Sequence, residues 1–138
     1  MASFRIIAAL VFLQAPGIAL GADQPGLAPA METVCADPGV LGKIQARFAW
    51  AERNTWHRGF VIESIGNPRP SGHPYAEPGL VHRDYCVADA VMTNGSAHQV
   101  YYAIEHGLGF VGLGHDVDFC VPGLDPWHVH DGDCRTVR

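Results

Sequence analysis

Basic residues are scarce in this sequence. Its 138 residues include one lysine, Lys43, and nine Lys and Arg in total against fourteen Asp and Glu, which gives a formal net charge of −5 with histidine neutral. Nucleic acids and anionic membranes are recognised through basic patches. The charge balance therefore argues against both as main partners.

Familiar catalytic motifs are also missing. Ser64, Ser71 and Ser96 lie in no Gly-x-Ser-x-Gly nucleophile elbow. The sequence contains no phosphate-binding loop, no Cys-x-x-Cys-His haem motif, and no Cys-x-x-Cys pair for a thiolate zinc site. These absences favour a protein that is not an enzyme.

Long apolar runs are limited to the N-terminus. Arg5 precedes the apolar run Ile6–Leu13, and the small-residue segment Ala19-Leu20-Gly21 follows. A positive charge, a short apolar run and a cleavage site of small residues predict a secretory signal peptide over residues 1–21. The run is well below the ~20 residues that span a bilayer, so a membrane anchor is disfavoured. We expect an exported protein, either periplasmic or secreted.

Signal cleavage would leave 117 of the 138 residues, with eight Lys and Arg against fourteen Asp and Glu and a net charge near −6. The following segment is rich in Pro, Gly and Ala without periodicity, so we expect residues 22–34 to be a flexible mature N-terminus. Residues 35–138 are expected to form a single α+β domain. No membrane association is expected after cleavage.

Export would place the four cysteines in an oxidising compartment. Outside the reducing cytosol, Cys35, Cys86, Cys120 and Cys134 are expected to form two disulfides, for which three pairings exist. In a simple meander Cys86 and Cys120 would lie two strands apart, at ~4.8 Å per strand, beyond disulfide reach. We therefore favour Cys35–Cys86 with Cys120–Cys134. The second bond closes a loop of about 15 residues, worth roughly 3 kcal/mol.

One helix is predicted near the start of the domain. Asp37 is a favourable N-cap residue, and Pro38 suits the first helical position. We expect the helix to end near His57 or Arg58, with Gly59 as its C-cap. An apolar stripe at three-four spacing supports it, formed by Leu41, Ile44, Phe48, Ala51 and Thr55.

The segment Val81–His106 predicts two strands joined by a two-residue type I′ turn at Asn94-Gly95, because both residues tolerate positive φ. This turn places Thr93 opposite Ser96. Alternating pairs then fall on one face together with Val100: Val91 with His98, Val87 with Tyr102, and Tyr85 with Ile104.

Three further segments complete the predicted fold. A strand is expected over residues 60–65, and the four prolines of residues 66–79 argue there for a loop without a regular ladder. Alternation predicts a strand over residues 116–121, with a last short strand over 127–130. The predicted fold class is α+β, with one N-terminal helix packed on a four- to five-stranded antiparallel sheet in cystatin-like or NTF2-like element order.

Residues 81–138 contain several short motifs that carry a resemblance. They are Tyr85-Cys86, Val100-Tyr101-Tyr102, Gly107-Leu108-Gly109-Phe110, Cys120-Val121-Pro122-Gly123, Trp127 and Cys134-Arg135. Together with the signal peptide, they resemble small exported bacterial proteins of uncharacterised function. The resemblance implies export and disulfides, and it implies no activity.

Eight histidines are many for a chain of 138 residues. We expect the candidate metal ligands to be His115, His128 and His130, because a strand would place the last two on one face and because aspartates surround all three. Histidine with carboxylate suits Zn, Cu or Ni. The remaining five are expected to face solvent: His57, His73, His82, His98 and His106.

Two carboxylates, Asp84 and Glu105, face each other in the predicted hairpin register. Paired carboxylates can perform acid–base chemistry. Arg83 and His106 can neutralise this pair near the open end of the hairpin, so we interpret the pair as structural.

The function predicted first is a non-enzymatic, disulfide-stapled binding module for an unidentified protein or small-molecule partner, with no cofactor. Its contact surface would come from the proline-rich loop, the glycine corner and the Cys120–Cys134 loop. The alternative is a divalent-metal-binding protein or metalloenzyme that holds Zn or Cu in the C-terminal His/Asp cluster.

The export prediction can be tested by N-terminal sequencing. The exported protein should begin at Ala22 or Asp23, because signal peptidase cleaves after small residues. Recovery of intact Met1 from the exported fraction would contradict the prediction.

Overall fold

The computed structural model describes residues 34–72, 81–108 and 114–138. The predicted signal peptide and nearly all of the predicted flexible N-terminus lie outside these residues. So do His73 and the glycine-corner residues 109–113.

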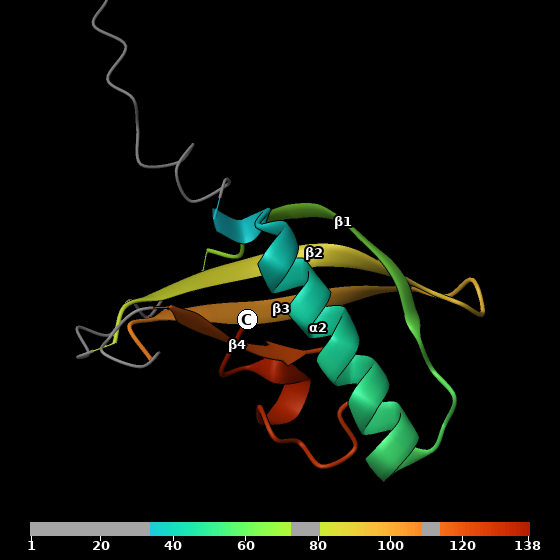
Figure 1. Ribbon diagram of the computed structural model, residues 1–138. Helices are drawn as coiled ribbons and strands as arrows, with labels where there is room; N and C mark the ends of the chain where they lie inside the picture. Colours follow the sequence, from blue (N-terminus) through green and yellow to red (C-terminus); the bar gives the residue numbers. More distant parts are fainter. Residues whose placement is uncertain (1–33, 73–80, 109–113) are drawn as a thin grey trace, which may run out of the picture.

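In the described part of the chain, helix α2 and a four-stranded antiparallel sheet are the main elements, which confirms the α+β class (Figure 1). The strand order β1-β2-β3-β4 is a simple meander, and α2 crosses one face of the sheet. The elements are α2 Pro38–Ala51, η1 Glu52–Trp56, β1 Ile62–Pro70, β2 Arg83–Met92, β3 Ala97–His106, β4 His115–Cys120 and η3 Gly132–Cys134.

Helix α2 begins as the sequence predicts. The Asp37 carboxylate accepts hydrogen bonds from the N–H groups of Gly39 at 2.7 Å and Val40 at 3.2 Å, and Pro38 occupies the first turn. The helix continues into the π-helical turn η1. It ends at His57, which adopts a left-handed conformation with φ 53°, so the predicted cap at Gly59 is wrong by two residues.

The β2–β3 turn differs from the prediction by one residue. The Met92 N–H donates to Ser96 O at 2.9 Å, and the Gly95 N–H donates to Met92 O at 2.8 Å, so the loop holds Thr93, Asn94 and Gly95. Only Gly95 has positive φ, at 82°, as in a type I turn followed by a glycine bulge. A two-residue type I′ turn is therefore wrong here.

This turn moves the register by one residue, so Val91 faces Ala97 and Cys86 faces Tyr102. The predicted core residues of β3 are correct, because Val100, Tyr102 and Ile104 are all buried. On β2 the other face is buried against α2. It carries Cys86, Ala88, Ala90 and Met92 rather than the predicted Tyr85, Val87 and Val91.

Strand β1 continues to Pro70, beyond the predicted end at residue 65. The predicted effect of the prolines is visible nonetheless, because the pairing with β2 slips between Gly66 and Arg69. β1 is an edge strand, where a missing N–H donor and a bulge are tolerated.

The C-terminal segment does not form the predicted fifth strand; among the described residues the sheet has four. Residues 127–130 form consecutive turns, with the Asp131 N–H bonded to His128 O at 3.0 Å. His128 has φ 51°, which a regular strand does not allow. The end of the chain instead packs Cys134 and Val137 against Ala103 and Cys120, on the sheet face opposite α2.

Both predicted disulfides are present, Cys35–Cys86 and Cys120–Cys134. The meander places β3 between β2 and β4, so the spacing argument against Cys86–Cys120 holds. The Tyr102 hydroxyl reinforces the first bond, since it donates to the buried Cys35 carbonyl at 2.7 Å. Burial raises the pKa of that hydroxyl, so it stays protonated and able to donate.

Tyr102→Phe should lower the free energy of unfolding by about 1 to 2 kcal/mol, because it leaves a buried carbonyl without its donor. Tyr101→Phe is the matched control. Its hydroxyl donates to Gln99 at an exposed position, and its loss should cost less than about 0.5 kcal/mol. Urea unfolding with the disulfides intact measures both. Equal losses would contradict a special role for the Tyr102 contact.

Candidate functional site

The structure does not bring the three predicted metal ligands together. His115 begins β4, whereas His128 and His130 lie in the C-terminal turns. His128 is exposed, and the His130 ring pairs with the Thr136 hydroxyl at 3.1 Å. The change from strand to turns removes the same-face spacing on which the prediction of His128 and His130 depended.

A different group of metal-capable side chains converges. His82, Asp84 and His106 each offer a ligand atom, and these atoms all lie within 4.8 Å of one another. The β2–β3 register produces this cluster. His82 and Asp84 are two residues apart and share a face, and the His106 N–H bonds to His82 O at 2.9 Å across the ladder.

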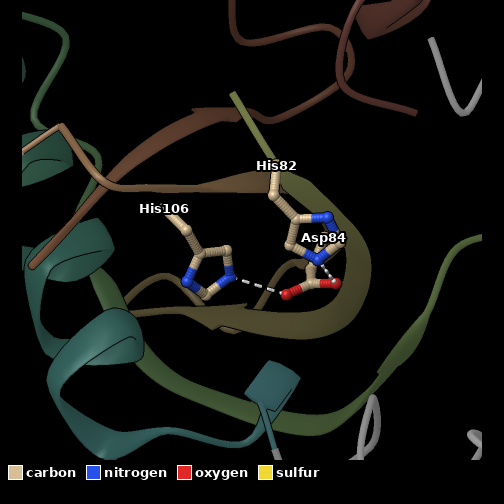
Figure 2. A group of neighbouring side chains, drawn as sticks. All are labelled: His82, Asp84 and His106. Carbon is tan, nitrogen blue, oxygen red and sulfur yellow. Dashed lines mark hydrogen bonds and ion pairs between the residues drawn. The ribbon is translucent and has the colours of Figure 1, made fainter. Parts of the chain in front are cut away.

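The Asp84 carboxylate joins the two imidazoles (Figure 2). His106 Nε2 lies 2.7 Å from Asp84 Oδ2, and His82 Nε2 lies 3.3 Å from Asp84 Oδ1. The ring centroids of the two histidines are 5.3 Å apart. The Asp84 side chain is only 11 % exposed, against 40 % for His106 and 74 % for His82. The carboxylate of the cluster is therefore nearly buried, whereas its two imidazoles are accessible to solvent.

The predicted pairing of Asp84 with Glu105 is wrong, whereas the predicted partners of these carboxylates, Arg83 and His106, are present. Glu105 does not face Asp84; it pairs with Arg83, with Nε to Oε1 at 2.5 Å, on the opposite face. The hydrogen bond that the Arg83 guanidinium donates to Glu105 raises the pKa of Arg83. Arg83 therefore pairs with Glu105. The contacts described for the Asp84 carboxylate are with the imidazoles of His82 and His106.

His115 continues the row of histidines onto the next strand. It lies directly opposite His106 in the β3–β4 ladder, and directly opposite residues share a sheet face. Its Nε2 is buried and has no hydrogen-bond partner within residues 34–72, 81–108 and 114–138. One of the three predicted ligands therefore adjoins the cluster that the fold assembles.

Helix α2 holds the start of β4 in place. Lys43 Nζ donates to His115 O at 3.0 Å, and Arg47 donates to Val117 O at 2.7 Å and to the Asp116 carboxylate at 2.6 Å. The Val117 N–H and then Arg47 lower the pKa of Asp116. These contacts fix His115 beside His106 from the helix side.

Two imidazoles and one carboxylate with open positions form a ligand set used for Zn, Cu, Ni and non-haem iron. The same His–Asp contact can also serve as a proton acceptor. The sequence contains a signal for this cluster, namely His-x-Asp on one strand and a histidine near the end of its hairpin partner. The one-residue error in register separated these side chains in the prediction.

Comparison of the chain with models of protein families, with curated proteins and with solved structures finds no match. The resemblance to small exported bacterial proteins and the cystatin-like or NTF2-like element order stay predictions. The function must therefore be argued from the site itself.

Asp116→Asn should lower the free energy of unfolding at pH 6 by less than about 1 kcal/mol, because its ion pair with Arg47 is half exposed and screened. The lowered pKa means that the carboxylate stabilises the fold above the ordinary aspartate range. This contribution is lost as pH falls through the lowered folded-state value. The gap between the wild type and the variant should therefore close between about pH 5 and pH 2.

Urea unfolding at pH 6 and pH 2 measures that gap, and repeating the pH 6 series in 0.5 M salt provides a control. Salt should shrink the gap at pH 6, since it screens an exposed pair. A gap of the same size at both pH values would show that Asp116 does not act through its charge.

Proposed function

We propose that this chain is an exported, disulfide-stapled protein that binds a divalent transition metal at His82, Asp84 and His106. Two intramolecular disulfides support the export part, because such bonds persist in oxidising compartments. Among the described residues, no helix is long and apolar enough to cross a membrane. The proposed localisation is periplasmic or secreted.

The observation that carries the metal proposal is the environment of the Asp84 carboxylate. Removing an ionised carboxylate from water is costly unless a cation or donors compensate it. Asp84 is nearly buried, and its described partners are the imidazole nitrogens of His82 and His106 rather than a Lys or Arg side chain. A divalent cation bound to both imidazoles and the carboxylate would supply the missing charge.

The donor set favours Zn, Cu or Ni over Ca or Mg, because two of the three donors are imidazole nitrogens. Tetrahedral zinc takes a fourth ligand, which can be water or a further side chain. His115 is opposite His106 in the ladder, but its ring nitrogens are not among the converging ligand atoms, so we propose water as the fourth ligand. Metal carriage or storage fits this set without any catalytic step.

A second candidate function is the non-enzymatic binding module predicted from the sequence. Trp127 and Val129 support it, because both are large apolar side chains and each is 65 % exposed. They lie in the C-terminal loop that the Cys120–Cys134 bond closes. Large exposed apolar side chains in a loop closed by a disulfide can supply a contact surface.

The metal proposal predicts a specific difference between two double variants. His82→Gln with His106→Gln should weaken zinc binding about 100-fold or more, because it removes two ligands, and loss of an outer-shell partner alone costs 10- to 100-fold. Glutamine amides can still donate to Asp84, so the fold should persist. His128→Gln with His130→Gln removes two imidazoles elsewhere and should leave the affinity unchanged.

Calorimetric titration of zinc into the purified mature protein at pH 7.5 measures the affinities, and circular dichroism checks each fold. Binding should weaken at pH 5.5, because protons compete for the imidazole nitrogens. Loss of binding only in the His128/His130 variant would support the site predicted from the sequence, and no binding by the wild type would reject both sites.

A further inference from the structure

The three side chains of the metal-capable cluster differ in how far they reach into solvent. The Asp84 side chain is 11 % exposed, whereas the His106 and His82 side chains are 40 % and 74 % exposed. A cation held by all three groups would have protein on its carboxylate side and solvent on its imidazole side. The imidazole side is therefore where a further ligand can reach the metal.

The number of converging donors leaves one coordination position open. Within residues 34–72, 81–108 and 114–138, the group that converges has three members, and each offers one ligand atom. Structural zinc sites are closed by four protein ligands, whereas sites with three protein ligands keep a position for water or another small ligand. Water on an accessible metal exchanges with donors that arrive from solvent. The arrangement therefore suits a site that accepts an external ligand.

The two imidazoles are held unequally. His106 is the last residue of β3, and its Nε2 lies 2.7 Å from Asp84 Oδ2. His82 precedes the first residue of β2, and its Nε2 lies 3.3 Å from Asp84 Oδ1 (Figure 2). His82 is thus the most exposed and the most loosely held of the three groups. It is the ligand that an incoming donor can displace most easily.

We propose that this site passes its metal to an acceptor protein through a ternary complex. In that complex a histidine imidazole of the acceptor takes the place of the water, while His82, Asp84 and His106 still hold the metal. Displacement of His82, and then of the other two groups, completes the transfer. The metal keeps its charge throughout, because each bond to this chain that breaks is replaced by a bond to the acceptor. The inference rests on the proposed metal function and specifies it as metal carriage.

The donor group of the acceptor follows from the metal and from the proposed compartment. Imidazole suits Zn, Cu and Ni, and it already supplies two of the three donors of this site. Thiolates also bind zinc, but free thiols are scarce in the oxidising compartments where disulfides such as these two persist. Carboxylates suit Ca and Mg better. A histidine side chain is the partner group that fits best.

Stopped-flow transfer of zinc to the chromophore 4-(2-pyridylazo)resorcinol tests the order of events on the full mature protein. This probe binds zinc partly through an aromatic nitrogen, and its visible absorption changes when it does. With the probe in excess, the transfer rate should rise in proportion to the probe concentration, because the probe takes part in the step that releases the metal. A rate that is independent of probe concentration would show that the metal leaves first, and it would overturn the proposal.

Cobalt(II) spectroscopy tests the open position itself. Cobalt takes the place of zinc, and its visible spectrum reports the ligands around the metal. Added imidazole should change this spectrum in a saturating manner, while gel filtration should show that the cobalt is still bound to the protein. An unchanged spectrum, or release of cobalt without a new spectrum, would contradict the ternary complex.

Two further measurements separate this inference from the metal proposal. Calorimetry comes first: no zinc binding by the wild type rejects both, whereas zinc binding with a probe-independent release rate rejects the ternary complex alone. The His128→Gln and His130→Gln double variant keeps all three ligands, so it should transfer zinc at the wild-type rate. Slower transfer by this variant would overturn the assignment to the cluster. A zinc-dependent dimer in sedimentation velocity would show that a second copy of this chain fills the open position instead.

Discussion

The register of the β2–β3 hairpin controls which side chains meet in this protein. Gly95 sets it by adopting a left-handed conformation that inserts one extra residue into the turn. A slip of one residue would send Asp84 and Cys86 to the opposite face of the sheet. The His82–Asp84–His106 cluster and the Cys35–Cys86 bond would then both be lost. One glycine thus determines both a candidate metal site and a covalent link.

The sheet is covered on both faces, and each covering is joined to it by a disulfide. Cys35 precedes α2 and bonds to Cys86 on the helix side, whereas Cys134 bonds to Cys120 on the far side. The histidine cluster lies where β2 begins and β3 ends, away from the hairpin turn. The exposed side chains of the second candidate function lie in the loop that the Cys120–Cys134 bond closes. The two candidate sites therefore depend on different contacts.

Local signals made much of the fold predictable. Asp37 and Pro38 identified the helix start, and strand spacing identified the cysteine pairing. The histidine cluster was not predicted, because its members meet only in the correct register, and the sequence Asn94-Gly95 is compatible with more than one turn. For His128 and His130 the prediction placed two side chains on one face that the fold does not provide. Their spacing indicated a shared face only for a strand, and turns replaced that strand.

The outer strands have a consequence for how copies of this protein behave together. An exposed strand edge can pair with the edge of another molecule and start aggregation. On β4, side chains of α2 already bind the carbonyl oxygens of His115 and Val117. On β1, Pro68 and Pro70 lack N–H donors, and a bulge interrupts the edge. Both borders of the sheet thus oppose strand-to-strand self-association.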